Sequence, residues 1–258
     1  MPTKKSSLGQ LRGAIRHHFE PHRHSALLAA IIAAFAVSPL VGDTDAGTVA
    51  FSLALVLLLL VALYNINVNI DELVGERSRL LAEKRRRRIL GWTLATAAAL
   101  GRISSIVVHG RMLYLAGSIS WLLFVLYVTL SELRSLLKQR EVTGETICMA
   151  ISVYLLLGFA WGYLYVVIFE LNPQSFGGLA TAQSGSSMMH TVSLLAYFSL
   201  TTLSTIGFGD ITPLTLQARH VAVAEGITGQ FYMAILVARL VGMQMSRTAN
   251  KLAKIQNV

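Results

Sequence analysis

Long stretches of this chain contain no Asp, Glu, Lys or Arg, and this distribution of charge strongly constrains the fold. Only 14% of the 258 residues are charged and 54% are hydrophobic, whereas a soluble domain is usually nearer a quarter charged. Apolar stretches of about 20 residues cross a lipid bilayer as α-helices. Because such stretches and their short connectors take up nearly the whole chain, we expect a membrane protein without a large soluble domain.

Six apolar runs have the length of a membrane-spanning helix. They cover approximately residues 25–41, 48–68, 89–108, 112–130, 146–169 and 221–243. A shorter run, 188–203, lies between the fifth and sixth and is too short to span; a re-entrant helix is an option at that length. The sequence therefore predicts an all-α membrane protein with six transmembrane helices and a re-entrant helix between helices five and six.

The basic residues lie in alternate connectors and predict the orientation of the chain. The N-terminal segment, the connectors after the second and fourth runs and the C-terminal segment are basic, whereas the connector after the first run is acidic and the one after the fifth run has no Lys or Arg. Cytoplasmic loops carry an excess of Lys and Arg. We expect a multi-pass protein of the inner or plasma membrane with both termini cytoplasmic, although Arg102 and Arg111 oppose this mildly. A signal peptide is the alternative interpretation of the first run.

The sequence Thr-Ile-Gly-Phe-Gly-Asp, at residues 205–210, follows the short apolar run. It resembles the selectivity filter of the tetrameric potassium channels, whose core reads Thr-x-Gly-Tyr/Phe-Gly-Asp. In such a filter, rings of backbone carbonyl groups replace the water around K+. Gly207 and Gly209 can adopt positive φ at little cost, which would let consecutive carbonyl groups point toward one axis. A chance match in an ordinary loop is the alternative interpretation.

The resemblance implies a role for each residue in and before this motif. The ion-binding set would be Thr205, Ile206, Gly207, Phe208 and Gly209. The first four would hold K+, the Ile and Phe side chains would point away from the pore axis, and Asp210 would lie at the outer mouth. Residues 188–202 would form the pore helix, and the residues supporting the filter would be Tyr197, Phe198, Thr201 and Thr202. At Thr201 some family members have a glutamate behind the filter; regulation through that carboxylate is not expected here.

Three residues of the last run carry further hypotheses. Gly229 falls where the family often has a hinge glycine in the inner helix, and close helix packing is an equal alternative. Glu225 is an ionisable residue within a predicted span and is therefore a candidate for function; pairing with Arg219, His220 or a neighbouring subunit is the alternative. Arg239 could extend to the inner interface, and a position lining the inner mouth is the weaker alternative.

The first four runs resemble a voltage-sensing domain only in number and order. A voltage sensor carries several arginines at every third position of its fourth helix. Residues 112–130 contain no Lys or Arg, so we expect little voltage dependence.

The runs, their connectors and the resemblance divide the chain into five segments. We expect a cytoplasmic N-terminal segment, a four-helix peripheral domain, a linker, a pore domain and a cytoplasmic tail, at residues 1–24, 25–130, 131–145, 146–245 and 246–258. The resemblance is strong over residues 146–243 and weak before them.

The expected partners are further copies of the chain and membrane lipids. One filter motif in each chain implies that four copies surround a pore as a homotetramer. Four consecutive arginines, Arg85, Arg86, Arg87 and Arg88, would either bind anionic lipid headgroups or anchor the topology. The net charge of +9 is better explained by membrane orientation than by nucleic-acid binding.

The function expected from these features is passive, potassium-selective conduction. The alternatives are a potassium uptake transporter subunit and a less selective cation channel. The sequence has no nucleophile–base set, nucleotide-binding glycine loop or zinc-ligand spacing, so we expect no enzyme activity and no cofactor apart from K+ as the permeant ion.

Overall fold

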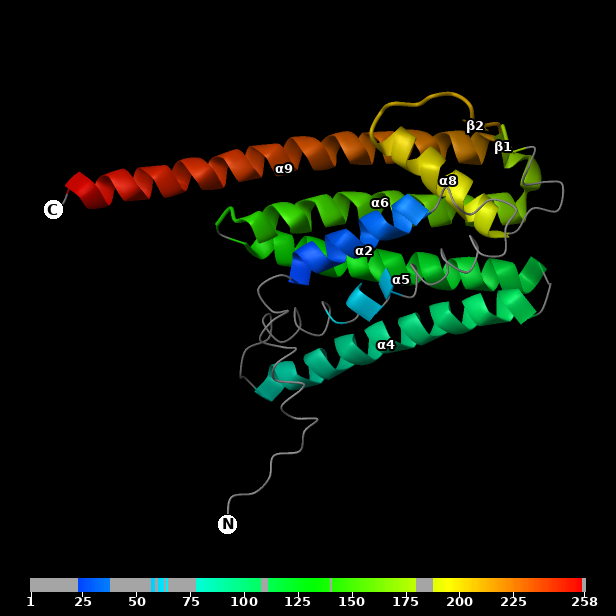
Figure 1. Ribbon diagram of the computed structural model, residues 1–258, viewed down its shortest axis with the longest axis horizontal. Helices are drawn as coiled ribbons and strands as arrows, with labels where there is room; N and C mark the ends of the chain where they lie inside the picture. The colour runs from blue at the N-terminus through cyan, green and yellow to red at the C-terminus, as the bar shows by residue number, and fades with distance from the viewer. Residues whose placement is uncertain are drawn as a thin grey trace, which may run out of the picture.

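The computed structural model describes residues 23–37, 57–58, 60–62, 64, 78–107, 111–139, 141–179 and 188–256. These residues form helices and one small strand pair, so the described part is all-α as predicted (Figure 1). The main helices are α2 (Arg23–Val37), α4 (Ser78–Val107), α5 (Arg111–Lys138), α6 (Gly144–Leu171), α8 (Met188–Leu203) and α9 (Leu216–Gln256). The 3-10 helix η3 (Pro173–Ser175), β1 (Phe176–Gly177) and β2 (Thr212–Pro213) connect them.

Among the described residues, three helices are long and apolar enough to cross a membrane, namely α5, α6 and the part of α9 over Leu216–Met245. Helix α2 is apolar over His24–Ala36 but shorter, and α4, which holds most of the third predicted run, is not among the three. Most of the second predicted run, 48–68, lies outside the described residues. The prediction of six spans is therefore not confirmed.

Helices α4, α5 and α9 extend further than the apolar pattern predicts, and α9 continues to Gln256 instead of ending near residue 243. Helix α4 begins at Ser78, well before the run that starts at residue 89, and includes the four consecutive arginines. Helix α5 continues to Lys138, past the predicted end at residue 130. Arg, Lys, Leu and Glu are good helix formers, so α4 and α5 continue through segments that are polar but still favour helical backbone.

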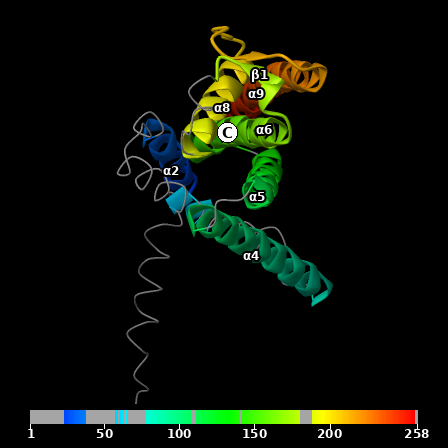
Figure 2. The same ribbon diagram turned by 90° about the vertical axis from the view of Figure 1, so that its right-hand side faces the viewer.

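The helices pack in an order that leaves α4 far from the last helix. Helix α6 contacts α5, α8, α2 and α9, whereas α4 packs on α5. Figure 2, which looks along the helices, shows α5 between α4 and the group formed by α6, α8 and α9. Helix α9 is the longest, and its C-terminal end extends past the other described helices (Figure 1).

Glycines allow α8 to lie directly on α6. A Cβ atom at Gly162 would lie 3.1 Å from Cα of Ala196, and one at Gly158 would lie within 2.4 Å of a methyl group of Leu200. Small residues permit such close approach of helices in membranes. The rings of Tyr165, Phe176 and Phe198 pack edge to face, with centroids 5.0–5.5 Å apart. This cluster fixes α8 and β1 against α6.

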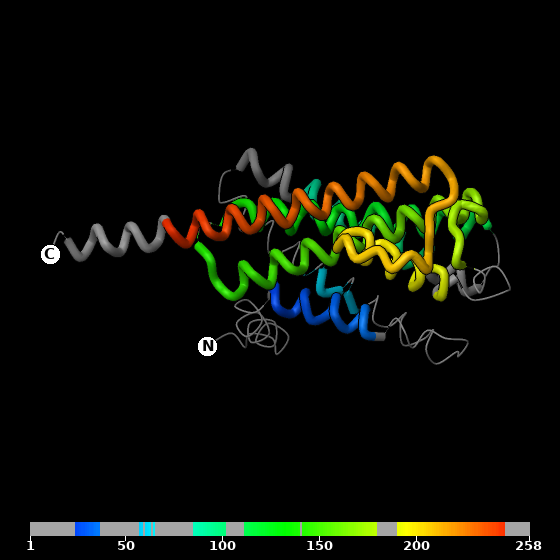
Figure 3. The backbone as a smooth tube through the Cα atoms, turned by 90° about the horizontal axis from the view of Figure 1, so that it is seen from above, coloured from blue at the N-terminus to red at the C-terminus, as the bar shows by residue number. Residues whose placement is uncertain are grey.

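The strand pair joins the segment after α6 to the segment before α9. Phe176 is paired with Pro213 and Gly177 with Thr212 in antiparallel register, and the N–H of Leu214 donates to the carbonyl of Ser175 at 2.8 Å. Seen from above, α8, the segment that follows it and the start of α9 lie at the same end of the molecule (Figure 3). The residues of the predicted filter lie within this assembly.

Candidate functional site

The predicted filter segment starts where α8 ends. The carbonyl oxygen of Thr201 accepts hydrogen bonds from the N–H groups of Ile206 and Gly207, at 2.9 and 3.1 Å. The carbonyl of Thr202 accepts from the N–H of Thr205 at 3.0 Å. The last turn of a helix leaves carbonyl groups without intrahelical partners, and here the filter segment supplies those partners. Residues 205–207 are thus held against the C-terminal end of α8.

The backbone of this segment has positive φ at every second residue. The values are 60° at Thr205, 54° at Gly207 and 79° at Gly209. The two glycines were predicted to adopt positive φ and do so, whereas the positive φ of Thr205 was not predicted. Alternation of right- and left-handed backbone turns successive N–H groups to one side of a chain and leaves the carbonyl groups for the other. This backbone is therefore suited to present several carbonyl oxygens to one ligand.

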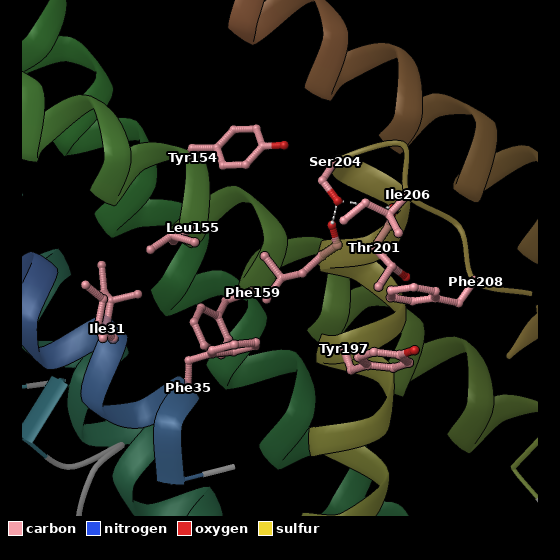
Figure 4. A pocket seen from close by; sticks show the side chains of 12 residues that line it. Ile31, Phe35, Tyr154, Leu155, Phe159, Tyr197, Thr201, Ser204, Ile206 and Phe208 are labelled. Carbon is pink, nitrogen blue, oxygen red and sulfur yellow. Dashed lines mark hydrogen bonds between the residues drawn. The ribbon is translucent and has the colours of Figure 1, made fainter. Parts of the chain in front are cut away.

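The two apolar side chains of the motif line an apolar pocket of about 440 Å³ (Figure 4). Ile206 and Phe208 remain 58% and 68% exposed in the single chain. Ser204, just after α8, also lines it, and the other lining residues come from α2, α6 and α8, namely Ile31, Ile32, Phe35, Tyr154, Leu155, Phe159, Tyr197, Leu200 and Thr201. Both side chains of the motif thus lie on the side of the segment that faces these helices.

The four residues predicted to support the filter make different contacts in the structure. Tyr197 donates from its hydroxyl to Oδ2 of Asp210 at 2.9 Å. Thr201 and Thr202 act through the backbone carbonyls already described. Phe198 contacts Tyr165 and Phe176 and is 6% exposed. Its ring therefore packs α8 against α6, and a role in supporting the filter stays a prediction.

Gly229 lies where α9 packs against the C-terminal end of α8. A Cβ atom at this position would lie 2.2 Å from the carbonyl oxygen of Leu203. Only glycine therefore fits here without a shift of one helix. Close packing, the alternative explanation for this residue, accounts for the glycine in the structure. Helix α9 is continuous from Leu216 to Gln256, and a hinge at Gly229 stays a prediction.

The partners of Glu225 differ from those expected. Its carboxyl group is fully buried, with the Tyr165 hydroxyl 2.5 Å from Oε2 and the Ser199 hydroxyl 2.5 Å from Oε1. Arg219 instead donates to the carbonyl of Pro213, and His220 contacts that of Leu216. A carboxyl group therefore lies against α8, the predicted pore helix, although Thr201 carries none. No sequence signal identifies these partners, because they lie 26 and 60 residues away.

Arg239 also has partners that the sequence did not indicate. Its Nη2 donates to the carbonyls of Leu137 and Gln139, at 2.5 and 3.1 Å. Extension to the inner interface and a place at the inner mouth both stay predictions for this side chain. It satisfies carbonyls at the C-terminal end of α5, where a cation is also favoured by the helix dipole.

This region of the chain is similar to a known protein family. Residues 145–245 match the family described as Ion channel, and this match includes α6, α8, the filter segment and the spanning part of α9. The match coincides with the predicted pore domain. The matched family is one of ion channels and not of enzymes. The described part of the chain also includes three helices long and apolar enough to span a membrane.

Individual relatives of the chain include a potassium channel. "Voltage-gated potassium channel Kch" of Escherichia coli (strain K12) is 24% identical over 155 residues, which are 60% of this chain and 35% of that protein. "Protein LctB" of Bacillus caldotenax and of Geobacillus stearothermophilus are 34% and 32% identical over 90 and 92 residues, each covering 34% of this chain. The chain thus spans 35% to 62% of the length of these relatives. No solved structure matches it significantly.

Proposed function

We propose that this chain is a subunit of a potassium-selective channel that conducts K+ passively through a pore surrounded by four copies. The observation that carries the proposal is the alternating positive φ at Thr205, Gly207 and Gly209. This backbone is hydrogen-bonded to the end of α8, inside a region that matches the ion channel family. The similarity to a protein named as a potassium channel supports the choice of ion.

In this proposal K+ exchanges its water for oxygen atoms of the filter segment. Carbonyl oxygens of Thr205, Ile206, Gly207 and Phe208 are the ligands, with Gly209 at the outer end. Carbonyl rings of this kind coordinate K+ in selective channels. Asp210 contributes negative charge at the outer mouth, and helix α8 directs its C-terminal, partially negative end toward the segment.

Four copies are proposed because one chain supplies a single filter segment and leaves much apolar surface uncovered. Only 11% of the apolar, membrane-spanning stretch of α9, within Leu216–Met245, is buried in the single chain. Val223, Ile227, Phe231 and Ile235 follow one another at four-residue spacing along α9 and are 51–63% exposed. Residues at this spacing share one face of a helix. In the proposed tetramer, neighbouring subunits and lipid cover this face.

The chain would lie in the inner or plasma membrane with both termini cytoplasmic. Arg85, Arg86 and Arg88 are exposed on α4, which supports anionic lipid binding there. Helix α5 has no Lys or Arg between Arg111 and Arg134. Arg111 donates to the carbonyls of Glu170 and Leu171 at the end of α6. We therefore propose that voltage controls this channel weakly.

The reversal potential of the purified protein tests the proposal, in a planar bilayer with K+ on one side and Na+ on the other. A reversal near the K+ equilibrium potential is expected. A reversal near zero with current flowing would replace the proposal by a less selective cation channel. Absence of any current would contradict the proposal that the chain forms a channel and would favour a transporter subunit.

A matched pair of glycine variants makes the test specific to the filter. Gly207→Ala places a side chain at a φ of 54°, where no neighbouring atom lies within 4 Å of the new Cβ. Its cost is therefore conformational, about 1–2 kcal/mol in each subunit, and selectivity should be lost. Gly242→Ala adds a methyl group within helix α9, also with nothing within 4 Å, and should conduct like the natural chain.

A further inference from the structure

The carboxyl group of Glu225 lies where three helices of the pore region meet. Glu225 belongs to α9, Ser199 to α8 and Tyr165 to α6. All three residues are 0% exposed. The carboxyl group contacts one hydroxyl with each of its oxygen atoms, at 2.5 Å in both cases. It is therefore the shared partner of a side chain from each of the other two helices.

Among the described residues, no cationic side chain is paired with this carboxyl group. The polar contacts of Glu225 there are the hydroxyls of Tyr165 and Ser199, and the nearby Arg219 and His220 are bonded to backbone carbonyls. Burying an ionised carboxylate without a paired charge costs several kcal/mol. The environment therefore favours a neutral carboxyl group.

The hydrogen-bond contacts of Ser199 also favour a neutral carboxyl group at Glu225. Its Oγ lies 2.6 Å from the carbonyl oxygen of Gly158 and 2.5 Å from Oε1 of Glu225. A hydroxyl carries one proton, and a carbonyl oxygen can only accept. If Glu225 were ionised, two acceptors would compete for that single proton and one short oxygen–oxygen contact would lack a hydrogen.

A proton on Oε1 of Glu225 satisfies every contact. Tyr165 then donates to Oε2, Oε1–H donates to Ser199, and Ser199 donates to the carbonyl of Gly158. Each short contact holds one hydrogen, and the chain of bonds runs from α6 through α9 to α8 and back to α6. Buried polar networks stabilise a structure when every member is satisfied.

We propose that Glu225 is a neutral carboxylic acid that clasps α6, α8 and α9 together and positions the filter segment. Ser199 lies two residues before Thr201, whose carbonyl holds Ile206 and Gly207. One turn further along α9, Gly229 packs on the carbonyl of Leu203. Helix α9 thus holds the second half of α8 at two successive turns. The positioning role rests on the proposed function, whereas the protonation does not.

Substitutions at Glu225 separate a neutral acid from a required charge. Glu225→Gln keeps the pattern of one donor and one acceptor, since the amide NH₂ donates to Ser199 and the amide oxygen accepts from Tyr165. Its ratio of K+ to Na+ permeability should stay within about twofold of the natural value. Glu225→Ala leaves the two hydroxyls without their partner and should lower that ratio by about tenfold.

An infrared difference spectrum between the natural chain and Glu225→Gln tests protonation directly and needs no current. The carbonyl stretch of a protonated carboxylic acid should be present in the natural chain and absent from the variant. Absence of that band, or Glu225→Gln channels as unselective as Glu225→Ala channels, would overturn the proposal. If the natural chain shows the band but conducts without selectivity, the neutral Glu225 that joins the three helices is supported. Both the proposed function and the positioning role are then wrong.

Discussion

The hydroxyl group of Tyr197 donates a hydrogen bond of 2.9 Å to Oδ2 of Asp210, 13 residues further along the chain. The ring of the same tyrosine is stacked on Phe208, with centroids 6.3 Å apart and an angle of 4° between the planes (Figure 4). One residue of α8 therefore contacts two residues at the outer end of the filter segment. The hydroxyl and the ring can be tested separately.

Tyr197→Phe removes the hydrogen bond to Asp210 and keeps the stacked ring. A hydrogen bond of this kind contributes about 0.5–1.5 kcal/mol, so the ratio of K+ to Na+ permeability should fall between about twofold and tenfold. Reversal potentials measure this ratio. Tyr154→Phe is the control, because Tyr154 lines the same pocket and its hydroxyl makes no hydrogen bond to other described residues. Equal effects of the two substitutions would contradict the role of the Tyr197 hydroxyl.

Gly229→Ala should destabilise the folded protein. The new methyl group would meet the carbonyl oxygen of Leu203 at 2.2 Å, and overpacking of this kind costs about 1–3 kcal/mol. Thermal unfolding in detergent measures the loss, with Gly242→Ala as the control that should be neutral or slightly stabilising. If Gly229→Ala altered channel opening while stability stayed unchanged, a hinge and not close packing would explain the glycine.

Arg239→Met should loosen the contact between the end of α5 and α9. The substitution keeps an apolar stem and removes the donors to Leu137 and Gln139. Hydrogen bonds to charged groups contribute about 1.5–3 kcal/mol, so amide hydrogen exchange at residues 136–139 should become about tenfold faster or more. Arg134→Met, at an exposed position of α5, is the control. Unchanged exchange in Arg239→Met would show that the contact contributes little.

The conductance should depend weakly on voltage in symmetric K+. Each elementary charge that moves through the membrane field contributes about 2.3 kcal/mol per 100 mV. Helix α5 carries no Lys or Arg from Met112 to Leu133, so the fitted gating charge should be below about one for each subunit. A steep conductance–voltage curve would show that charges outside this helix move with voltage.

The sequence predicted the elements around the filter well and the distant side-chain contacts poorly. The pore helix was expected at residues 188–202 and α8 is Met188–Leu203; the fifth run, 146–169, corresponds to α6 over Gly144–Leu171. The ends of these two helices could be predicted because the sequence changes from apolar to polar there. In α4 the polar arginines continue the helix, so polarity alone does not mark where it begins.

The contacts of Glu225 and Arg239 could not be predicted, for a different reason. Both side chains find partners on helices distant in sequence, up to 102 residues away for Arg239. The faces of two helices that meet depend on their crossing, which periodicity does not specify. The backbone conformation of Gly207 and Gly209, in contrast, follows from local steric preference and was predicted correctly.

The pairing of β1 with β2 closes a loop that contains α8 and the filter segment. The approach is tight, since a Cβ atom at Gly178 would collide with the carbonyl oxygen of Asp210. Closing a loop removes conformational freedom from the chain within it. An arriving ion would therefore meet a preorganised binding site, and little of its binding free energy would be spent on ordering the backbone. Selectivity would then depend on how stiffly the closed loop keeps its shape when a smaller ion enters.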